Sequence, residues 1–122
     1  MKRTIMISQP MKDLSNDKII KIRKNAIHTL ETFGYDVIDN FFTDYTDDGY
    51  IAEDTKHKPV AYLAKSIEKM SKCDAVYFVK GWETARGCKI EHEIAKAYGL
   101  AIIMRIDIYD KTKRYRRISL SR

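Results

Sequence analysis

Short runs of strand-forming residues alternate along this chain with longer stretches of helical periodicity, and this alternation constrains the fold more than any other feature. Strands are predicted at residues 5–7, 35–39, 73–79 and 100–104, of which the third is an almost unbroken apolar run. Strands that are apolar on both faces and separated by helices are typical of a parallel sheet. We therefore expect an α/β fold with a central, mainly parallel sheet covered by helices on both faces.

Three helices are predicted between these strands, at residues 15–34, 59–70 and 88–98. Their apolar residues recur at steps of three and four, and serine, proline or glycine stands at their ends. Open α/β sheets bind ligands at the C-terminal ends of their strands, where the strand order reverses. The loops at residues 8–14 and 80–87 both follow a strand and enter a helix, so the functional site is predicted there.

The net charge of +6 comes entirely from the C-terminal end of the chain. Residues 111–122 hold six basic residues and no acidic one, and the rest of the chain carries 17 residues of each sign. A neutral body argues against a nucleic-acid-binding fold as a whole. We expect residues 1–108 to form the α/β domain and residues 109–122 a basic extension. That extension is either a solvated edge strand or hairpin, or a segment that contacts phosphate or another subunit.

Nothing in the sequence indicates a membrane span, secretion or a metal site. No apolar run approaches the roughly 20 residues that a bilayer requires, and the basic N-terminus is too short for a signal peptide. Cys73 and Cys88 lack metal-ligand spacing and are expected to be reduced thiols. We expect a cytoplasmic protein without a cofactor.

Glu91 is the charged residue that the third predicted helix places among its buried positions. At about 100° per residue, the buried arc of this helix holds Ile90, Ile94, Ala95, Ala97 and Tyr98. Glu91 falls inside this arc, whereas His92 falls on the polar side. Burying a charge is costly, but a nearby helix N-terminus favours the ionised carboxylate. Such a carboxylate suits a nucleophile or a general base.

Several of these residues have an equally open structural interpretation. Glu91 could cap backbone N–H groups of the 81–87 loop or pair with Arg86. Trp82 is as readily a packing lid as a recognition residue. Cys88 is better explained by packing than by a reactive thiol, and Asp74, at the start of a buried strand, by hydrogen bonds to nearby backbone.

Three segments together carry a family resemblance: ISQPM at residues 7–11, CDAVY at residues 73–77 and GWETARGCKIEHEIA at residues 81–95. They resemble a family of small bacterial and phage proteins of unknown function. That family is similar to the nucleoside 2-deoxyribosyltransferases and the deoxynucleoside-monophosphate N-glycosidases. The resemblance extends to about Met104 and leaves out the basic C-terminal segment. It implies a flavodoxin/Rossmann-like three-layer sandwich, a homo-oligomer, and a nucleoside or nucleotide as the small-molecule partner.

The resemblance also implies roles for individual residues. In the enzymes a glutamate follows a glycine and a small residue by a fixed step on a helix, which Gly87, Cys88 and Glu91 match. Glu91 would attack C1′ of the sugar, release the base and form a glycosyl-enzyme that water or a second base resolves, as in a retaining glycosidase. The residues implied to bind the substrate are Ser8, Gln9, Pro10, Met11, Lys12, Phe41, Ser66, Gly81, Trp82, Arg86, Gly87 and Cys88.

Two positions depart from the pattern of these enzymes. They commonly place Asp or Ser two residues before the motif glycine, where Ala85 stands here, and the glycosidases carry an Asp on the preceding helix where Ser66 stands. Loss of an acid costs about 100-fold or more in rate. Besides nucleic-acid association through the basic extension, two functions of the predicted site are therefore left open. One is N-glycosidic cleavage or deoxyribosyl transfer through Glu91; the other is binding of a nucleotide-like ligand without catalysis, for sensing or sequestration.

Overall fold

The computed structural model describes the backbone of residues 2–41, 50–108 and 116–121, and the side chains of residues 2–41 and 50–104. Its elements in chain order are β1 (Thr4–Ser8), α1 (Asn16–Thr32), β2 (Asp36–Val37), α2 (Lys58–Met70), β3 (Ala75–Phe78), the one-turn 3-10 helix η2 (Trp82–Thr84), α3 (Arg86–Tyr98), β4 (Ala101–Ile108) and β5 (Arg116–Ser121).

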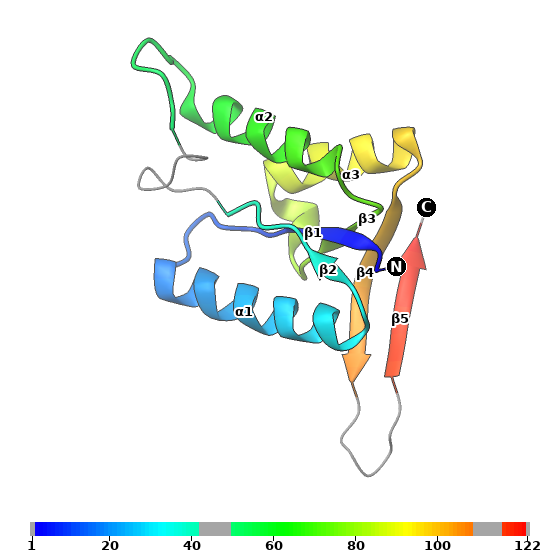
Figure 1. Ribbon diagram of the computed structural model, residues 1–122. Coiled ribbons are helices and arrows are strands. Elements are labelled where there is room, and N and C mark those ends of the chain that lie inside the picture. The colour runs from blue at the N-terminus through cyan, green and yellow to red at the C-terminus, as the bar shows by residue number, and fades with distance from the viewer. Residues whose placement is uncertain (1, 42–49, 109–115, 122) are drawn as a thin grey trace.

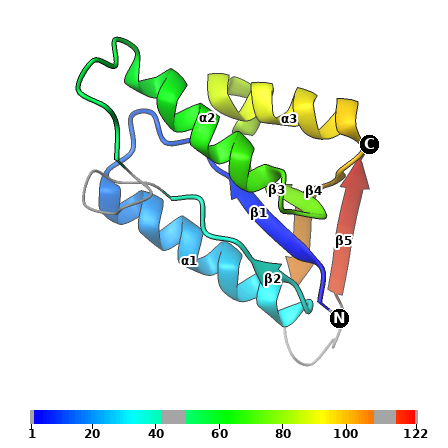
Figure 2. The same cartoon turned by 45° about the horizontal axis from the view of Figure 1, so that its top comes forward.

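The five strands form one sheet in the order β2-β1-β3-β4-β5. β1 to β4 run parallel, and β5 pairs antiparallel with β4. Helix α1 lies on one face of the sheet, and α2 and α3 lie on the other (Figure 1; Figure 2). This is the α/β three-layer, flavodoxin/Rossmann-like sandwich that was expected. Residues 116–121 of the basic segment extend the same sheet as its edge strand, whereas residues 109–115 lie outside the described residues.

Side chains of the strands alternate between two apolar layers, which places Ser8. The layer under α2 and α3 is made by Met6, Met70, Val76, Phe78, Ala95 and Ile102. The layer under α1 is made by Ile5, Ile7, Leu30, Ala75 and Ile103. Because side chains two residues apart along a strand share a face, Ser8 lies on the same side as Met6. It therefore faces α2 and α3 from the C-terminal end of β1.

Local signals explain where the helices begin and end. The Ser15 hydroxyl caps α1 by accepting a hydrogen bond of 3.2 Å from the backbone N–H of Lys18. Gly99 ends α3 with a φ of +77°, in the left-handed region that glycine adopts without strain. The predicted 80–87 loop differs in two respects: residues 82–84 form η2, and α3 begins at Arg86, two residues before the predicted start.

The orientation of α3 corrects part of the predicted buried arc. Cys88, Glu91 and Ala95 are its buried residues. Ile90 and Tyr98, which were expected inside, are 40% and 81% exposed. Ala97, also expected inside, is exposed, whereas Ile94 is half-buried and packs against the core layer under α2 and α3. Periodicity identifies which residues share a face, but the packing partner decides which face is buried.

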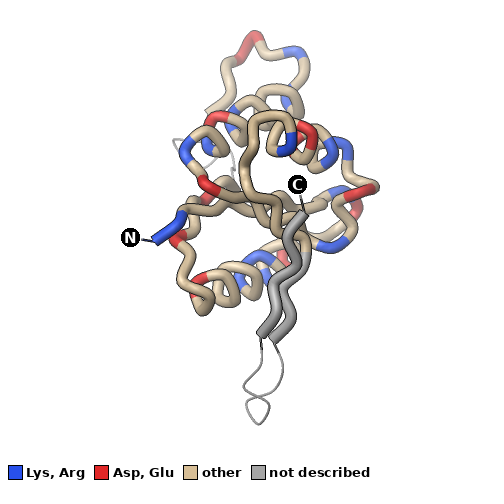
Figure 3. Tube along the Cα trace, turned by 90° about the vertical axis from the view of Figure 1, so that its right-hand side faces the viewer, with Lys and Arg blue, Asp and Glu red and all other residues tan. Residues whose placement is uncertain are grey.

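Charges of both signs are interspersed over the described helices and loops (Figure 3). This matches the formally neutral body of the sequence. Within the described residues, none of the helices has the length and apolar character that crossing a membrane requires.

Candidate functional site

Glu91 lies at the centre of the candidate site, and two serine hydroxyls hold its carboxylate. Ser8 Oγ donates to Oε1 at 2.6 Å, and Ser66 Oγ donates to Oε2. All three side chains are buried: Ser8 of β1 is 1% exposed, Ser66 of α2 is 8% exposed and Glu91 of α3 is 6% exposed. β1 lies where the strand order reverses, between β2 and β3. The group therefore sits at the end of the sheet where open α/β folds bind ligands.

Burial dominates the electrostatics of Glu91. It raises the pKa of this carboxyl above its ordinary value, while the hydrogen bonds from Ser66 and Ser8 act in the opposite direction. The predicted help from the helix N-terminus does not prevail, because Glu91 is the sixth residue of α3 and the dipole acts mainly within the first turn. The pairing with Arg86 is not among the contacts of the described part of the chain, and Arg86 is exposed.

A chain of polar contacts extends from Ser66 away from Glu91. Asn40 Nδ2 donates to Ser66 Oγ at 3.2 Å and to the carbonyl oxygen of Ile7 at 2.9 Å. Arg23 Nη2 donates to Asn40 Oδ1 at 2.6 Å. We call Glu91, Ser8, Ser66, Asn40 and Arg23 the Glu91 network. It links residues that are up to 83 positions apart in sequence.

Arg23 is 5% exposed, an unusual burial for a guanidinium. It donates to Gln9 Oε1 at 3.4 Å and pairs with Asp39 Oδ1 at 3.2 Å. The Asp39 side chain is 77% exposed, so solvent screens this ion pair. Burial lowers the pKa of Arg23, and Asp39 opposes that effect. Phe41, which was expected to bind a base, lies with its ring centroid 5.6 Å from the guanidinium carbon, at the outer end of the network.

Sequence reasoning missed Arg23 and Asn40, although each carried a signal. Arg23 follows Ile19 by four residues and so lies on the apolar face of α1, where a charge needs buried partners. Asn40 follows the second predicted strand directly, at the edge of the sheet where sites form.

The 9–12 loop divides between the network and the surface. Gln9 is buried, and its Nε2 donates to the Ile19 carbonyl at 2.8 Å, so it turns toward α1 and Arg23. Pro10 is half-buried, whereas Met11 and Lys12 are exposed. A Cβ placed on Gly81 would lie 3.7 Å from Pro10 Cγ, so the 9–12 and 80–85 loops lie side by side. Loops as long as residues 40–57 are often lids or binding loops, and part of this segment, including Phe42, lies outside the described residues.

Trp82 is a packing residue in this structure. Its ring stacks on His92 with centroids 4.3 Å apart and lies 5.4 Å from Phe78. The prediction that His92 faces solvent is therefore wrong: its ring packs against the rings of Trp82 and Phe78, and its Nε2 is buried without a hydrogen bond to any described residue. The helical periodicity placed His92 on the polar side, because periodicity does not show that η2 carries Trp82 across this face of α3.

The start of α3 contacts both α2 and the network. Gly87 faces Leu63, whose Cδ1 would lie 4.0 Å from an added Cβ. Cys88 is buried near Ser8 and Glu91, and burial raises the pKa of its thiol to about 11. Cys88 is thus a neutral packing residue at physiological pH. Both cysteines are free, and Asp74 accepts a hydrogen bond of 2.8 Å from the backbone N–H of Thr4, as its structural interpretation predicted.

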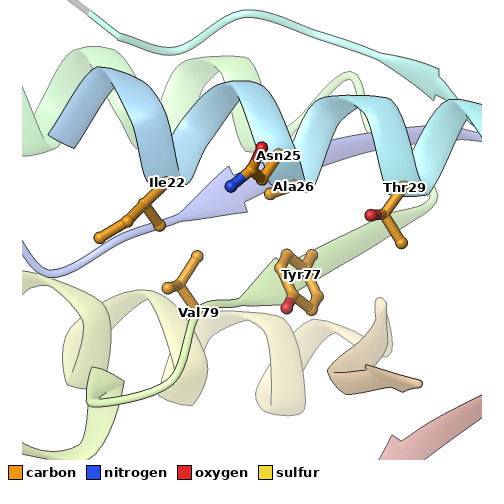
Figure 4. Close-up of a pocket in the computed structure, with 6 residues that line it drawn as sticks. All are labelled: Ile22, Asn25, Ala26, Thr29, Tyr77 and Val79. Carbon is orange, nitrogen blue, oxygen red and sulfur yellow. The ribbon is translucent and has the colours of Figure 1, made fainter. Parts of the chain in front are cut away.

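A groove of about 220 Å³ lies between α1 and β3, away from the Glu91 network (Figure 4). Its lining residues are Ile22, Asn25, Ala26, Thr29, Tyr77 and Val79. Tyr77 and Val79 alternate with Phe78 along the strand, so they point to the opposite face of the sheet from Ser8. Within the described residues, no cluster of His, Cys, Asp and Glu has the arrangement of a metal site.

Residues 4–104 match a protein family described as Domain of unknown function (DUF4406). The chain belongs to this family. The match covers β1 through the first half of β4, and so includes every residue of the Glu91 network. Neither the curated proteins nor the solved structures include a significant match to this chain.

Proposed function

We propose that this protein processes nucleosides or nucleotides, cleaving the N-glycosidic bond or transferring the deoxyribosyl group, with Glu91 as the nucleophile. The observation that carries the proposal is a buried carboxylate with a hydroxyl donor on each oxygen, at the C-terminal end of β1. A nucleophile must be held in one orientation to attack carbon, and two fixed donors from different elements do this. The resemblance at residues 81–95 supports the same residue.

The proposed reaction has two displacement steps at C1′ of the sugar. A carboxylate oxygen of Glu91 attacks C1′ while the C1′–N bond breaks, and the bonding electron pair leaves with the base, which takes a proton from solvent. Each oxygen of Glu91 retains a lone pair for this attack, because each accepts one serine hydroxyl. Water then attacks C1′, the C1′–O bond to Glu91 breaks, and the water proton passes to solvent. Deoxyribosyl transfer uses a second base in place of water.

Base release from deoxynucleoside monophosphates and nucleosides tests this proposal. Free base and exchanged base are separated by chromatography after incubation with the wild-type protein and with Glu91→Gln. The matched control is Glu93→Gln, which removes an exposed carboxylate two residues away on the same helix. We expect activity in the wild type and in Glu93→Gln, and a loss of about 1,000-fold or more in Glu91→Gln. No base release or exchange from any substrate contradicts the proposal.

One observation favours binding without catalysis as a second candidate. Ser66 stands where the glycosidases carry an acid, and its hydroxyl donates to Glu91. In that case a nucleotide raises the thermal midpoint without releasing its base. A ligand at 100 times its Kd stabilises the folded state by about 2.7 kcal/mol, which thermal unfolding detects. A midpoint that does not move with any nucleotide contradicts this candidate.

A further inference from the structure

The contacts of the Glu91 network determine which atom donates at each step. Arginine is only a donor, so the Asn40 atom that contacts Arg23 Nη2 at 2.6 Å is the carbonyl oxygen Oδ1. The Asn40 amide nitrogen then faces the carbonyl oxygen of Ile7, which is only an acceptor, and Ser66 Oγ. The positions of the amide oxygen and nitrogen of Asn40 are therefore both determined. The flipped amide would place its NH₂ donor against the Arg23 donor and its oxygen against the Ile7 carbonyl oxygen.

The orientation of Asn40 in turn determines the direction of the Ser66 hydroxyl. Ser66 Oγ accepts a hydrogen bond from Asn40 Nδ2 at 3.2 Å, and its single proton is directed at Glu91 Oε2. The hydrogen bonds from Arg23 through Asn40 and Ser66 to Glu91 therefore all have their donor on the Arg23 side and their acceptor on the Glu91 side. Its last acceptor is a carboxylate oxygen, which matches the ionised form of Glu91.

We infer that Arg23 is a positioning residue for Glu91, acting through Asn40 and Ser66 to keep a hydroxyl proton directed at the ionised carboxylate. The significance of this role for catalysis rests on the proposed function, whereas the direction of the hydrogen bonds does not. The inference also accounts for the burial of Arg23. The ion pair with Asp39 does not, because the carboxylate of Asp39 is 77% exposed and would be equally accessible to an arginine at the surface.

Three described elements bring polar groups against Glu91. Ser8 comes from β1, Ser66 from α2 and Cys88 from α3 itself. The pKa of the Cys88 thiol is raised to about 11, so this thiol remains neutral over the range in which a carboxyl titrates. Titration of Cys88 therefore does not contribute at this site between about pH 4 and about pH 9, and the carbon resonance of the Glu91 carboxyl reports on that group directly.

The test is the pKa of Glu91, measured by carbon NMR of its side-chain carboxyl. The proteins compared are the wild type, Arg23→Met, Asn40→Leu and the double variant, with Asp39→Asn as the matched control. Each single variant is expected to raise the pKa by about one unit, a tenfold gain in proton affinity. The double variant is expected to match the single variants, because both substitutions interrupt the same path. Asp39→Asn is expected to leave the pKa unchanged, since it removes only the exposed partner of Arg23.

Three results would overturn the inference. An unchanged pKa of Glu91 in the single variants shows that Arg23 and Asn40 do not affect the carboxylate. A shift in Arg23→Met that recurs in full on top of Asn40→Leu shows that the charge of Arg23 acts through space. An equal shift in Asp39→Asn shows that the ion pair is responsible.

The wild-type protein provides a second measurement that does not depend on whether the variants fold. The side-chain amide resonances of Asn40 are expected to titrate with the same midpoint as Glu91, whereas those of the exposed Asn25 are not. An Asn40 amide that is insensitive to the Glu91 titration overturns the inference. None of these readouts requires turnover. If the wild type releases base but the variants leave the pKa of Glu91 unaltered, only this inference is contradicted. If the variants shift the pKa of Glu91 as predicted but the wild type releases no base, only the proposed function is contradicted.

Discussion

Substitution of Ser66 by alanine isolates the energetic contribution of one donor to Glu91. The variant loses the hydrogen bond to Oε2 and leaves the buried carboxylate with Ser8 alone, at 2.6 Å. A hydrogen bond to a charged group contributes about 1.5–3 kcal/mol, and one between neutral groups about 0.5–1.5 kcal/mol. The loss of stability is therefore expected to depend on whether Glu91 is ionised.

The sign follows from the raised pKa of Glu91. A carboxyl whose pKa is higher in the folded state contributes stability that is fully present below its unfolded-state pKa and is lost as pH rises through the folded value. Removing the Ser66 donor raises the folded pKa further. We expect Ser66→Ala to reduce the free energy of unfolding by about 2 kcal/mol at about pH 9 and by about 1 kcal/mol at about pH 4.

Urea denaturation at the two pH values measures this difference, because the midpoint and slope together give the free energy of unfolding. Ser71→Ala is the matched control: its hydroxyl donates to the backbone carbonyl of Glu68 at the end of the same helix, and it has no hydrogen bond to a carboxylate of the described residues. Its cost is expected to be the same at both pH values. An equal cost for Ser66→Ala at both pH values, or a larger one in acid, would refute the reasoning.

Three further predictions follow from burial and backbone geometry. Glu91→Gln is expected to be more stable than the wild type at about pH 9, with the gain disappearing toward about pH 4, in the same urea titrations. Because burial raises the pKa values of Cys73 and Cys88 to about 11, both thiols are expected to react with a disulfide reagent at neutral pH much more slowly in the native than in the unfolded protein; equally fast reaction of the native protein would contradict this. Gly81 has a φ of +95°, so Gly81→Ala is expected to lower the free energy of unfolding by about 1 kcal/mol. Gly87 lies in α3, so Gly87→Ala is expected to raise it by about 0.5 kcal/mol. Thermal unfolding of the two variants measures both changes, and a Gly81→Ala variant as stable as the wild type would contradict the first.

The sheet and its helices were largely predictable because their signals are local. Ser15 and Gly34 bound α1 through capping chemistry, and the apolar run at residues 73–79 contains β3. The buried face of α3 was only partly predictable. Glu91 is buried as expected, but Ile90 and Tyr98 are exposed, because the packing of the helix against the sheet is not encoded in its own periodicity.

The candidate site was predictable in position and only partly in its contacts. The rule for open α/β sheets indicated the loop that begins at Ser8, and helical periodicity indicated Glu91. The family resemblance indicated Ser8, Ser66 and Glu91. No local pattern indicates that Arg23 contacts Asn40 or that Asn40 contacts Ser66. These contacts span 17 and 26 positions in sequence and arise only when α1, α2 and the segment after β2 pack together. A charge on an apolar helical face was the available signal for Arg23.

Trapping the covalent intermediate tests the role of Glu91 most directly. A nucleoside with fluorine at C2′ destabilises the positively charged transition state, which slows hydrolysis of a glycosyl-enzyme more than it slows capture when the leaving base is good. Intact-mass analysis followed by peptide mapping is expected to find one sugar per chain, attached at Glu91 and absent from Glu91→Gln. An unmodified protein that nonetheless releases base, or a sugar attached to another residue, would contradict the assignment of Glu91 as the nucleophile.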